Sequence, residues 1–264
     1  MKKLLKNMIF GAVIGASVLI PGMNGGTSAL ILGIYNDIIS AIDELFSDFK
    51  KNMPYLLTLT IGAALSFYIC SFPIRFVLER FAFEFSIFVV GVIFGSFPVF
   101  TKGMRKFKFS YLMYIFAGFI ITIIMDMASG IRFSAPDNPV TFIAVGLLSA
   151  VALILPGISL TYILIAFGYY DRLIVAVNEI DLLFILKFGT VIIIGIFAFT
   201  RLLNTAYKKY PVAVNMTVLG MVAASVKQVF IRMPVRDETL SSLLLFIAGI
   251  SVSLFFAVFK KDTD

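Results

Sequence analysis

Two short proline-glycine motifs are the segments of this sequence in which residue type and spacing point to chemistry. The first reads Pro-Gly-Met-Asn-Gly-Gly-Thr over residues 21–27, and the second reads Pro-Gly-Ile-Ser over residues 156–159. Asn24 and Ser159 stand at equivalent positions, and both are good N-cap residues, so we expect a helix to restart after each break. The free N–H groups and the positive dipole end of such a helix attract anions. The motifs therefore predict two half-sites for an anion.

Glycines and hydroxyls around the two motifs are the predicted ligands for this anion. Glycine lets a phosphate approach the backbone closely, and serine and threonine hydroxyls add hydrogen-bond donors. Residues 8–35 and 141–170, which contain the motifs, have no acidic, basic or histidine side chain. The predicted substrate-binding residues of the motifs are Gly22, Asn24, Gly25, Gly26, Thr27, Ser28, Gly157, Ser159 and Thr161.

Three charged residues beside apolar segments complete the candidate site. Arg75 and Arg201 follow corresponding apolar segments, and an arginine matches phosphate geometry and stays charged. Both could instead be interfacial anchors. Asp126, at the end of an apolar segment, is the candidate for binding a coupling proton. The lack of histidine and the single cysteine, Cys70, argue against a zinc site, and no metal or cofactor is predicted.

The two motifs belong to a repeat that runs through the chain. Residues 91–96 also resemble residues 220–225. A single Pro-Gly pair in a membrane helix would be interpreted as a packing kink. Because the pair is duplicated in register, a functional site is favoured. The other glycines of the repeat are expected to serve helix packing, and its tyrosines to anchor at the membrane interface. Adding 135 to the residue number pairs Gly11 with Gly146, Pro21 with Pro156, Gly22 with Gly157, Gly33 with Gly168 and Tyr35 with Tyr170.

Composition places this chain in a membrane. Hydrophobic residues make up 60% of the 264 residues and charged residues only 14%, which is more apolar surface than a soluble domain of this size can bury. The net charge of +7 comes from lysines and arginines between apolar segments, where they meet lipid headgroups rather than nucleic acid. Apolar segments are expected at residues 8–20, 27–42, 54–72, 85–100, 110–127, 139–155, 160–177, 182–200, 212–226 and 240–259.

Each half is expected to hold one broken, re-entrant helical hairpin and about three transmembrane helices. The two proline-glycine breaks are expected to lie close together near the bilayer midplane. The predicted fold is all-α and polytopic, a single membrane domain over residues 1–264 with repeat 1 at about 1–135 and repeat 2 at about 136–264. If each hairpin returns to the side of the membrane from which it starts, the other helices of a half cross an odd number of times. The second half then begins on the opposite side, and the repeats are inverted. If each hairpin crosses once, the repeats are parallel. Lysine and arginine are more numerous in the loops that an N-in, C-in arrangement places in the cytoplasm.

The doubled motif resembles that of a known family of bacterial membrane proteins. Residues 21–27 with Gly33-Ile34-Tyr35, and the second motif at 156–159, are similar to the domain-of-unknown-function 368 family, also called polyprenyl-phosphate transporters. The resemblance covers nearly the whole chain. It implies a flippase in the bacterial cytoplasmic membrane that returns undecaprenyl phosphate from the outer to the cytoplasmic leaflet, for carrier-lipid recycling in cell-envelope synthesis. The sequence departs from the family at Asn24, where serine is typical, and at residues 160–161, where Gly-Ser is expected.

Two other functions compete with this expectation. A membrane prenyl-diphosphate phosphatase would need a base or nucleophile, and the uncharged hairpins offer none, so an enzyme is not predicted. A transporter for another anion or a small solute would use the same half-sites. The expected partners are a lipid phosphate and the bilayer, with no nucleic acid, and homo-oligomerisation stays open.

Overall fold

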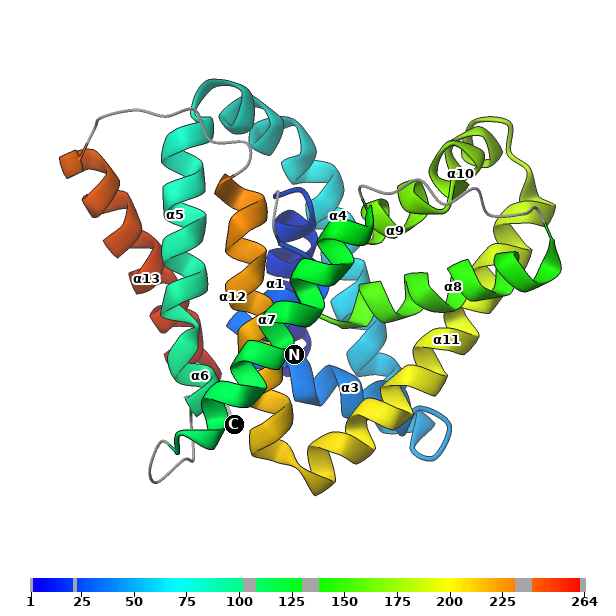
Figure 1. Cartoon of the computed structure of the whole chain (residues 1–264), viewed down its shortest axis with the longest axis horizontal. Coiled ribbons are helices and arrows are strands. Elements are labelled where there is room, and N and C mark those ends of the chain that lie inside the picture. Colours follow the sequence, from blue (N-terminus) through cyan, green and yellow to red (C-terminus); the bar gives the residue numbers. More distant parts are fainter. Residues whose placement is uncertain (1, 21–22, 102–107, 130–137, 231–238, 262–264) are drawn as a thin grey trace.

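The computed structural model describes residues 2–20, 23–101, 108–129, 138–230 and 239–261, and every regular element in these ranges is an α-helix (Figure 1). The predicted all-helical fold is therefore confirmed. The helices are, in chain order, α1 (Lys2–Val18), α2 (Gly25–Ile31), α3 (Tyr35–Asp43), α4 (Phe49–Arg80), α5 (Ala82–Gly95), α6 (Phe97–Thr101), α7 (Ser110–Ser129), α8 (Pro139–Ile154), α9 (Leu160–Ala166), α10 (Tyr169–Asn178), α11 (Leu182–Lys209), α12 (Pro211–Phe230) and α13 (Thr239–Lys261).

The long helices have the length and composition of membrane spans. In the described part of the chain, α4, α7 and α11 are long and apolar enough to cross a bilayer, and α1, α5, α8, α12 and α13 contribute shorter apolar helices. Large apolar side chains such as Phe72, Phe116 and Phe255 are exposed on α4, α7 and α13. Exposed apolar faces of this extent are unfavourable in water and favourable in lipid. The chain is accordingly a membrane protein.

Hydroxyl groups on the exposed helix faces bond to their own helices. Thr60 and Thr190 each donate to the carbonyl four residues earlier, at 2.9 and 2.7 Å. Ser251 does the same at 2.9 Å. Because these donors are satisfied internally, the hydroxyls can face hydrocarbon at little cost.

Two segments predicted as continuous apolar stretches each contain two helices in the structure. The expected segment over 27–42 divides into α2 and α3 at Gly33, and the one over 160–177 divides into α9 and α10 at Gly168. These glycines have φ angles of 69° and 73°, in the left-handed region that glycine adopts without strain. A Cβ on Gly168 would meet nothing within 4 Å, so the packing role predicted for Gly168 is wrong and its role is conformational.

The packing role predicted for Gly11 and Gly146 is confirmed. A Cβ on Gly11 would collide with the carbonyl oxygen of Leu59 in α4. A Cβ on Gly146 would lie 2.5 Å from Cγ1 of Val191 in α11. The helix before each break is therefore pressed closely against the long helix of its own half, α1 on α4 and α8 on α11.

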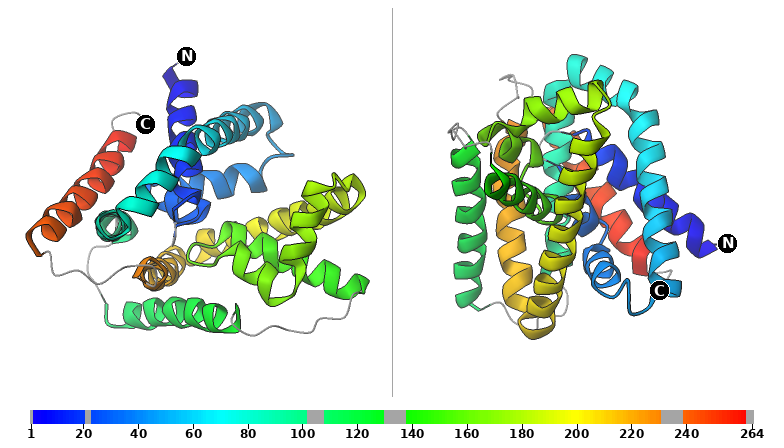
Figure 2. Two further views of the ribbon diagram at one scale, coloured as in Figure 1. Left: turned by 90° about the horizontal axis from the view of Figure 1, so that it is seen from above. Right: turned by 90° about the vertical axis from the view of Figure 1, so that its right-hand side faces the viewer.

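The last helix of each half packs against the other half. Helix α13 lies along α5, and α7 lies along α12 (Figures 1 and 2). A Cβ on Gly249 of α13 would collide with the carbonyl oxygen of Phe88, and one on Gly118 of α7 with that of Thr217. Residues 88 and 217 are related by the same displacement as the segments 91–96 and 220–225. Equivalent contacts therefore join each final helix to the opposite half.

The main core lies where the two halves meet. Leu32 of α2–α3, Ile93 of α5 and Val222 of α12 are fully buried in one hydrophobic cluster. A second cluster of aromatic rings, including Tyr169, Phe184 and Phe188, fills the space between α8, α10 and α11. The first broken hairpin thus packs into the centre of the molecule, between helices of both halves.

Candidate functional site

The first half-site is built around the side chain of Asn24, at the start of α2. Asn24 Oδ1 accepts a hydrogen bond from the backbone N–H of Thr27 at 2.8 Å, as predicted for an N-cap residue. The Asn24 carbonyl oxygen accepts from the backbone N–H and from the hydroxyl of Ser28, both at 3.0 Å. Asn24 therefore satisfies the free donors at the beginning of this short helix.

The same asparagine joins the two breaks. Its Nδ2 donates to the carbonyl oxygens of Leu155 and Ile158, each at 3.1 Å. These two carbonyls stand on either side of Pro156-Gly157, where the backbone is irregular and leaves acceptors free. The predicted proximity of the two breaks is confirmed in this respect, while Pro21 and Gly22 lie outside the described residues. We call the contact between residues 24–26 and residues 154–158 the break junction.

Gly26 and Tyr35 bring further backbone into the break junction. A Cβ on Gly26 would lie 2.6 Å from the carbonyl oxygen of Ile154 and 3.3 Å from the nitrogen of Pro156. The hydroxyl of Tyr35 donates to the same carbonyl oxygen of Ile154 at 3.1 Å. Only 3% of Tyr35 is exposed, so the interfacial role predicted for it is wrong. Its position in the duplicated Gly-x-Tyr sequence was the signal for a role at the site.

The hydroxyls of the first motif lie inside the protein. Thr27 is fully buried, and within the described part of the chain its Oγ1 has no hydrogen-bond partner. Ser28 is also buried, and its hydroxyl bonds to that of Ser17 in α1. Gly25 begins α2 and has room around it, because a Cβ there would come no closer than 3.7 Å to Ile14. The glycine and hydroxyls at residues 26–28 are therefore covered by protein, whereas Asn24 and Gly25 are half-buried.

The second half-site is more accessible. Gly157 has a φ of 79°, and a Cβ there would lie 2.6 Å from the Met221 carbonyl oxygen and 3.4 Å from Thr122 Oγ1. Ser159 occupies the N-cap position of α9 but makes no side-chain capping bond. Ser159 is half-buried and Thr161 is exposed. The two sequence-equivalent half-sites therefore differ in two respects: Asn24 caps its helix and Ser159 does not, and Gly26 is buried where the equivalent Thr161 is exposed.

The two predicted arginines are exposed, and neither takes part in the hydrogen bonds described above for the break junction. The Arg75 side chain on α4 is 80% exposed, and its Nε pairs with Glu79 Oε1 at 2.8 Å, one helical turn away. Arg201 is exposed on α11. Exposed ion pairs of this type contribute little to stability, and they leave the guanidinium free to exchange partners.

Asp126 forms an ion pair that sequence reasoning did not find. Its Oδ2 accepts from Nζ of Lys227 at 2.8 Å, which ties α7 to α12. The Asp126 side chain is 14% exposed. Asp126 lies one helical turn beyond Thr122, which faces Gly157. The ion pair therefore lies beside the second break. The sequence did not indicate this pair, because Asp126 and Lys227 are far apart along the chain.

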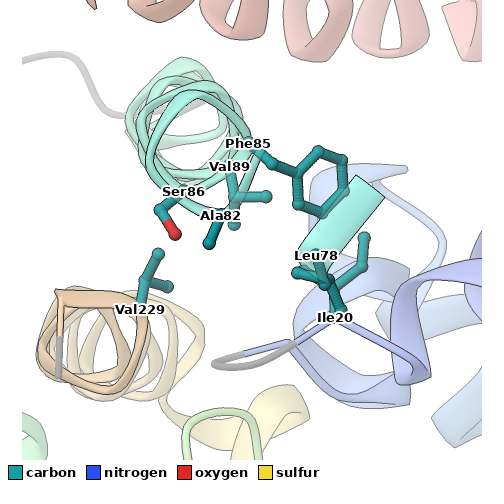
Figure 3. A pocket seen from close by; sticks show the side chains of 7 residues that line it. All are labelled: Ile20, Leu78, Ala82, Phe85, Ser86, Val89 and Val229. Atoms are coloured by element: carbon teal, nitrogen blue, oxygen red, sulfur yellow. The ribbon is translucent and has the colours of Figure 1, made fainter. Parts of the chain in front are cut away.

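A cavity opens next to the first break (Figure 3). Its volume is about 260 Å³, and it is bounded by the end of α1, the end of α4, the start of α5 and the end of α12. Figure 3 shows Ser86, a polar residue of the lining, directed toward Val229. The lining residues are Ile20, Leu78, Ala82, Phe85, Ser86, Val89 and Val229.

Comparison with known proteins shows the family to which this chain is similar. The chain matches the family described as VCA0040-like, undecaprenyl phosphate translocase-like, over residues 14–243. The chain belongs to this family. The match spans both breaks and all the residues of the break junction, so the geometry described above is that of a family member.

Two curated relatives support the same family. A polyprenyl-phosphate transporter of Vibrio cholerae serotype O1 is 29% identical over 78% of this chain and 71% of its own length. A polyprenyl-phosphate transporter of Staphylococcus aureus is 27% identical over 94% of each chain. No solved structure matches the chain.

Proposed function

We propose that this protein is a polyprenyl-phosphate transporter that moves undecaprenyl phosphate from the outer to the cytoplasmic leaflet of the bacterial cell membrane. Family membership and the names of both relatives support this substrate class. The break junction is the observation that carries the proposal. Asn24 bonds two carbonyls of the other half, so irregular backbone from both halves faces protein rather than lipid.

Separation of the break junction would supply the donors that a phosphate head needs. If residues 24–26 move away from residues 154–158, Asn24 Nδ2 loses its two carbonyl partners and becomes available to the phosphate. The buried Thr27 hydroxyl, which has no bonding partner in the described part of the chain, would join it. Together with Gly22, Gly25, Ser28, Gly157, Ser159 and Thr161, these groups would replace the water around the head. The prenyl tail would remain in the bilayer.

The proposed transport cycle uses two inverted repeats with both termini in the cytoplasm. The common helix order of the halves and their equivalent glycine contacts support the duplication. In Figure 1, α3 lies toward the bottom of the molecule and its counterpart α10 at the upper right, which supports inversion. Inverted repeats allow the two halves to exchange conformations and so to present one site to each leaflet in turn.

Arg75 and Arg201 are proposed to receive the phosphate, one from each half. Arg75 lies one turn before Leu78, which lines the cavity. Its partner Glu79 is itself exposed, so a lipid phosphate can replace it. Replacement of either arginine by glutamine should weaken binding of undecaprenyl phosphate and leave the unfolding midpoint unchanged. Unchanged binding in both variants would reduce the arginines to interfacial anchors.

Asp126 is the proposed coupling group. Protonation of its carboxylate would break the ion pair with Lys227, so a proton could be coupled to movement of α7 against α12 beside the second break. In vesicles with an imposed pH gradient, transport by the wild type should respond to the gradient and transport by Asp126→Asn should not. An equal response of both proteins would exclude Asp126 from coupling.

A transport assay tests the function itself. In reconstituted vesicles, the protein should accelerate the loss of outward-facing undecaprenyl phosphate, and Gly26→Leu should slow that loss by at least tenfold. Failure to move the lipid under any ion gradient, with ready uptake of a soluble anion, would favour the competing anion transporter. Release of inorganic phosphate from undecaprenyl diphosphate by the purified protein would instead favour the phosphatase.

A further inference from the structure

The apolar cavity beside the first break points to a second part of the substrate site: we propose that it binds the first isoprene units of the prenyl chain, those attached to the phosphate. The inference rests on the proposed function, because it concerns the same lipid. It adds a binding site for the chain, where the break junction would bind only the head.

The lining has the chemistry of a hydrocarbon site. Ile20, Leu78, Phe85 and Val229 present aliphatic and aromatic surface to the cavity, and Ser86 contributes the one hydroxyl among the described lining residues (Figure 3). Among the lining residues that the structure describes, none carries a charge. An allylic chain can therefore enter without stripping water from an ion, whereas a soluble anion would gain nothing from this surface.

The volume fits a short piece of the chain. An apolar cavity of about 150 Å³ accommodates one benzene molecule, which has six carbon atoms. By the same proportion, the 260 Å³ cavity holds about ten carbon atoms, or two isoprene units. The remainder of a long prenyl chain would extend into the bilayer.

The position joins the cavity to the proposed head site. Ile20 lines the cavity and immediately precedes the Pro-Gly pair of the first break. Asn24 of the break junction follows four residues later along the chain. A phosphate held near the junction would therefore bring its first isoprene units to the level of Ile20. The chain site and the head site are continuous along one segment of backbone.

At two of the positions that the repeat matches to cavity-lining residues, the side chains are larger and buried. The displacement that relates residues 91–96 to residues 220–225 matches Leu78 with Tyr207 and Val229 with Phe100. Tyr207 is 8% exposed and Phe100 is buried. The Tyr207 ring packs edge-on against Tyr35, with centroids 6.3 Å apart. Packed aromatic rings therefore occupy the two positions that correspond to Leu78 and Val229 of the open cavity, and this asymmetry is expected for a site that faces one leaflet at a time.

A chain-length comparison tests this site. The wild type should bind geranyl phosphate, with two isoprene units, at least tenfold more tightly than isopentenyl phosphate, with one. Ser86→Leu, which fills the cavity, should abolish this difference. Ser71→Leu makes the same change at an exposed position of α4 outside the cavity, and it should preserve the difference. Equal affinities of the wild type for both ligands, or equal behaviour of the two variants, would overturn the inference.

Photolabelling of the wild type provides a second test that does not depend on a variant. Geranyl phosphate with a diazirine on its second isoprene unit should label residues 78–89 or Val229. Labelling confined to other helices would overturn the inference. If the wild type transports undecaprenyl phosphate but fails these tests, the chain site is wrong and the proposed function stands. If the wild type neither binds nor transports undecaprenyl phosphate, the proposed function itself is wrong.

Discussion

Asn24 uses both ends of its side-chain amide in the structure. Its Oδ1 caps α2 and its Nδ2 bonds to carbonyls of Leu155 and Ile158. A serine at this position, typical of the resembled family, could accept from the helix N–H but has only one donor for the two carbonyls. The asparagine therefore makes a stronger connection between the two breaks than serine would.

Replacement of Asn24 by alanine should destabilise the protein more than loss of an ordinary helix cap. The cap contributes about 1 kcal/mol, and each of the two additional hydrogen bonds contributes about 1 kcal/mol net. Asn138 caps α8 in the same way through its bond from Thr141 N–H, without a bond to the junction. We expect a loss of about 3 kcal/mol for Asn24→Ala and about 1 kcal/mol for Asn138→Ala, measured by denaturant unfolding in mixed micelles. Equal losses would mean that the bridging bonds contribute nothing.

The neighbouring glycines Gly25 and Gly26 should respond oppositely to alanine. A Cβ on Gly26 would lie 2.6 Å from the Ile154 carbonyl oxygen, so Gly26→Ala must push the two breaks apart at a cost of about 1–3 kcal/mol. A Cβ on Gly25 would make ordinary contact at 3.7 Å, and alanine is the better helix former. The thermal unfolding midpoint should fall for Gly26→Ala and hold or rise for Gly25→Ala. A fall of the same size in both would show that the junction does not restrict residue 26.

At the level of elements, hydropathy located the apolar helices but not their interruptions. The segments 27–42 and 160–177 read as continuous because Gly33 and Gly168 sit in apolar sequence, where a packing glycine and a glycine of positive φ look alike. The proline-glycine breaks were visible because proline removes a backbone donor. The duplicated register then predicted that the two breaks approach each other.

The partners within the site could not be read from sequence. Asn24 was expected to cap α2, yet its bonds to Leu155 and Ile158 depend on tertiary approach of segments more than a hundred residues apart. The ion pair between Asp126 and Lys227 likewise depends on the tertiary approach of two distant segments. The different exposure of Gly26 and Thr161 was also unpredicted, because similar sequences in two halves carry no information about which half is more accessible.

Helices α7 and α13 each pack on the opposite half through a glycine in close contact with backbone. A Cβ on Gly118 would collide with the carbonyl oxygen of Thr217, and one on Gly249 with that of Phe88. Gly118→Ala and Gly249→Ala should therefore lower the unfolding midpoint by similar amounts, at a cost of about 1–3 kcal/mol each. Gly189 of α11 has nothing within 4 Å of its Cβ position, so Gly189→Ala should be neutral or slightly stabilising. Tolerance of alanine at Gly118 or Gly249 would contradict the close packing.

Over the whole molecule, α7 and α13 connect the two halves. Each final helix packs on the partner half, so neither half can move as an isolated body without carrying a helix of the other. The halves also differ in length, since α4 has 32 residues and α11 has 28. This difference accounts for four of the six residues by which the displacement falls, from 135 before the long helix to 129 after it.

The orientation of the two halves can be tested by labelling from each side of the membrane. Ser47, between α3 and α4, and Glu179, between α10 and α11, are exposed at corresponding turns of the two halves. In a Cys70→Ser background, an impermeant maleimide should label Glu179→Cys in intact cells and Ser47→Cys only after the membrane is opened. This outcome follows if the repeats are inverted with the N-terminus inside, because equivalent turns then face opposite sides. Labelling of both from one side would mean parallel repeats in which each broken hairpin crosses the membrane once. The single site facing each leaflet in turn would then have to be abandoned.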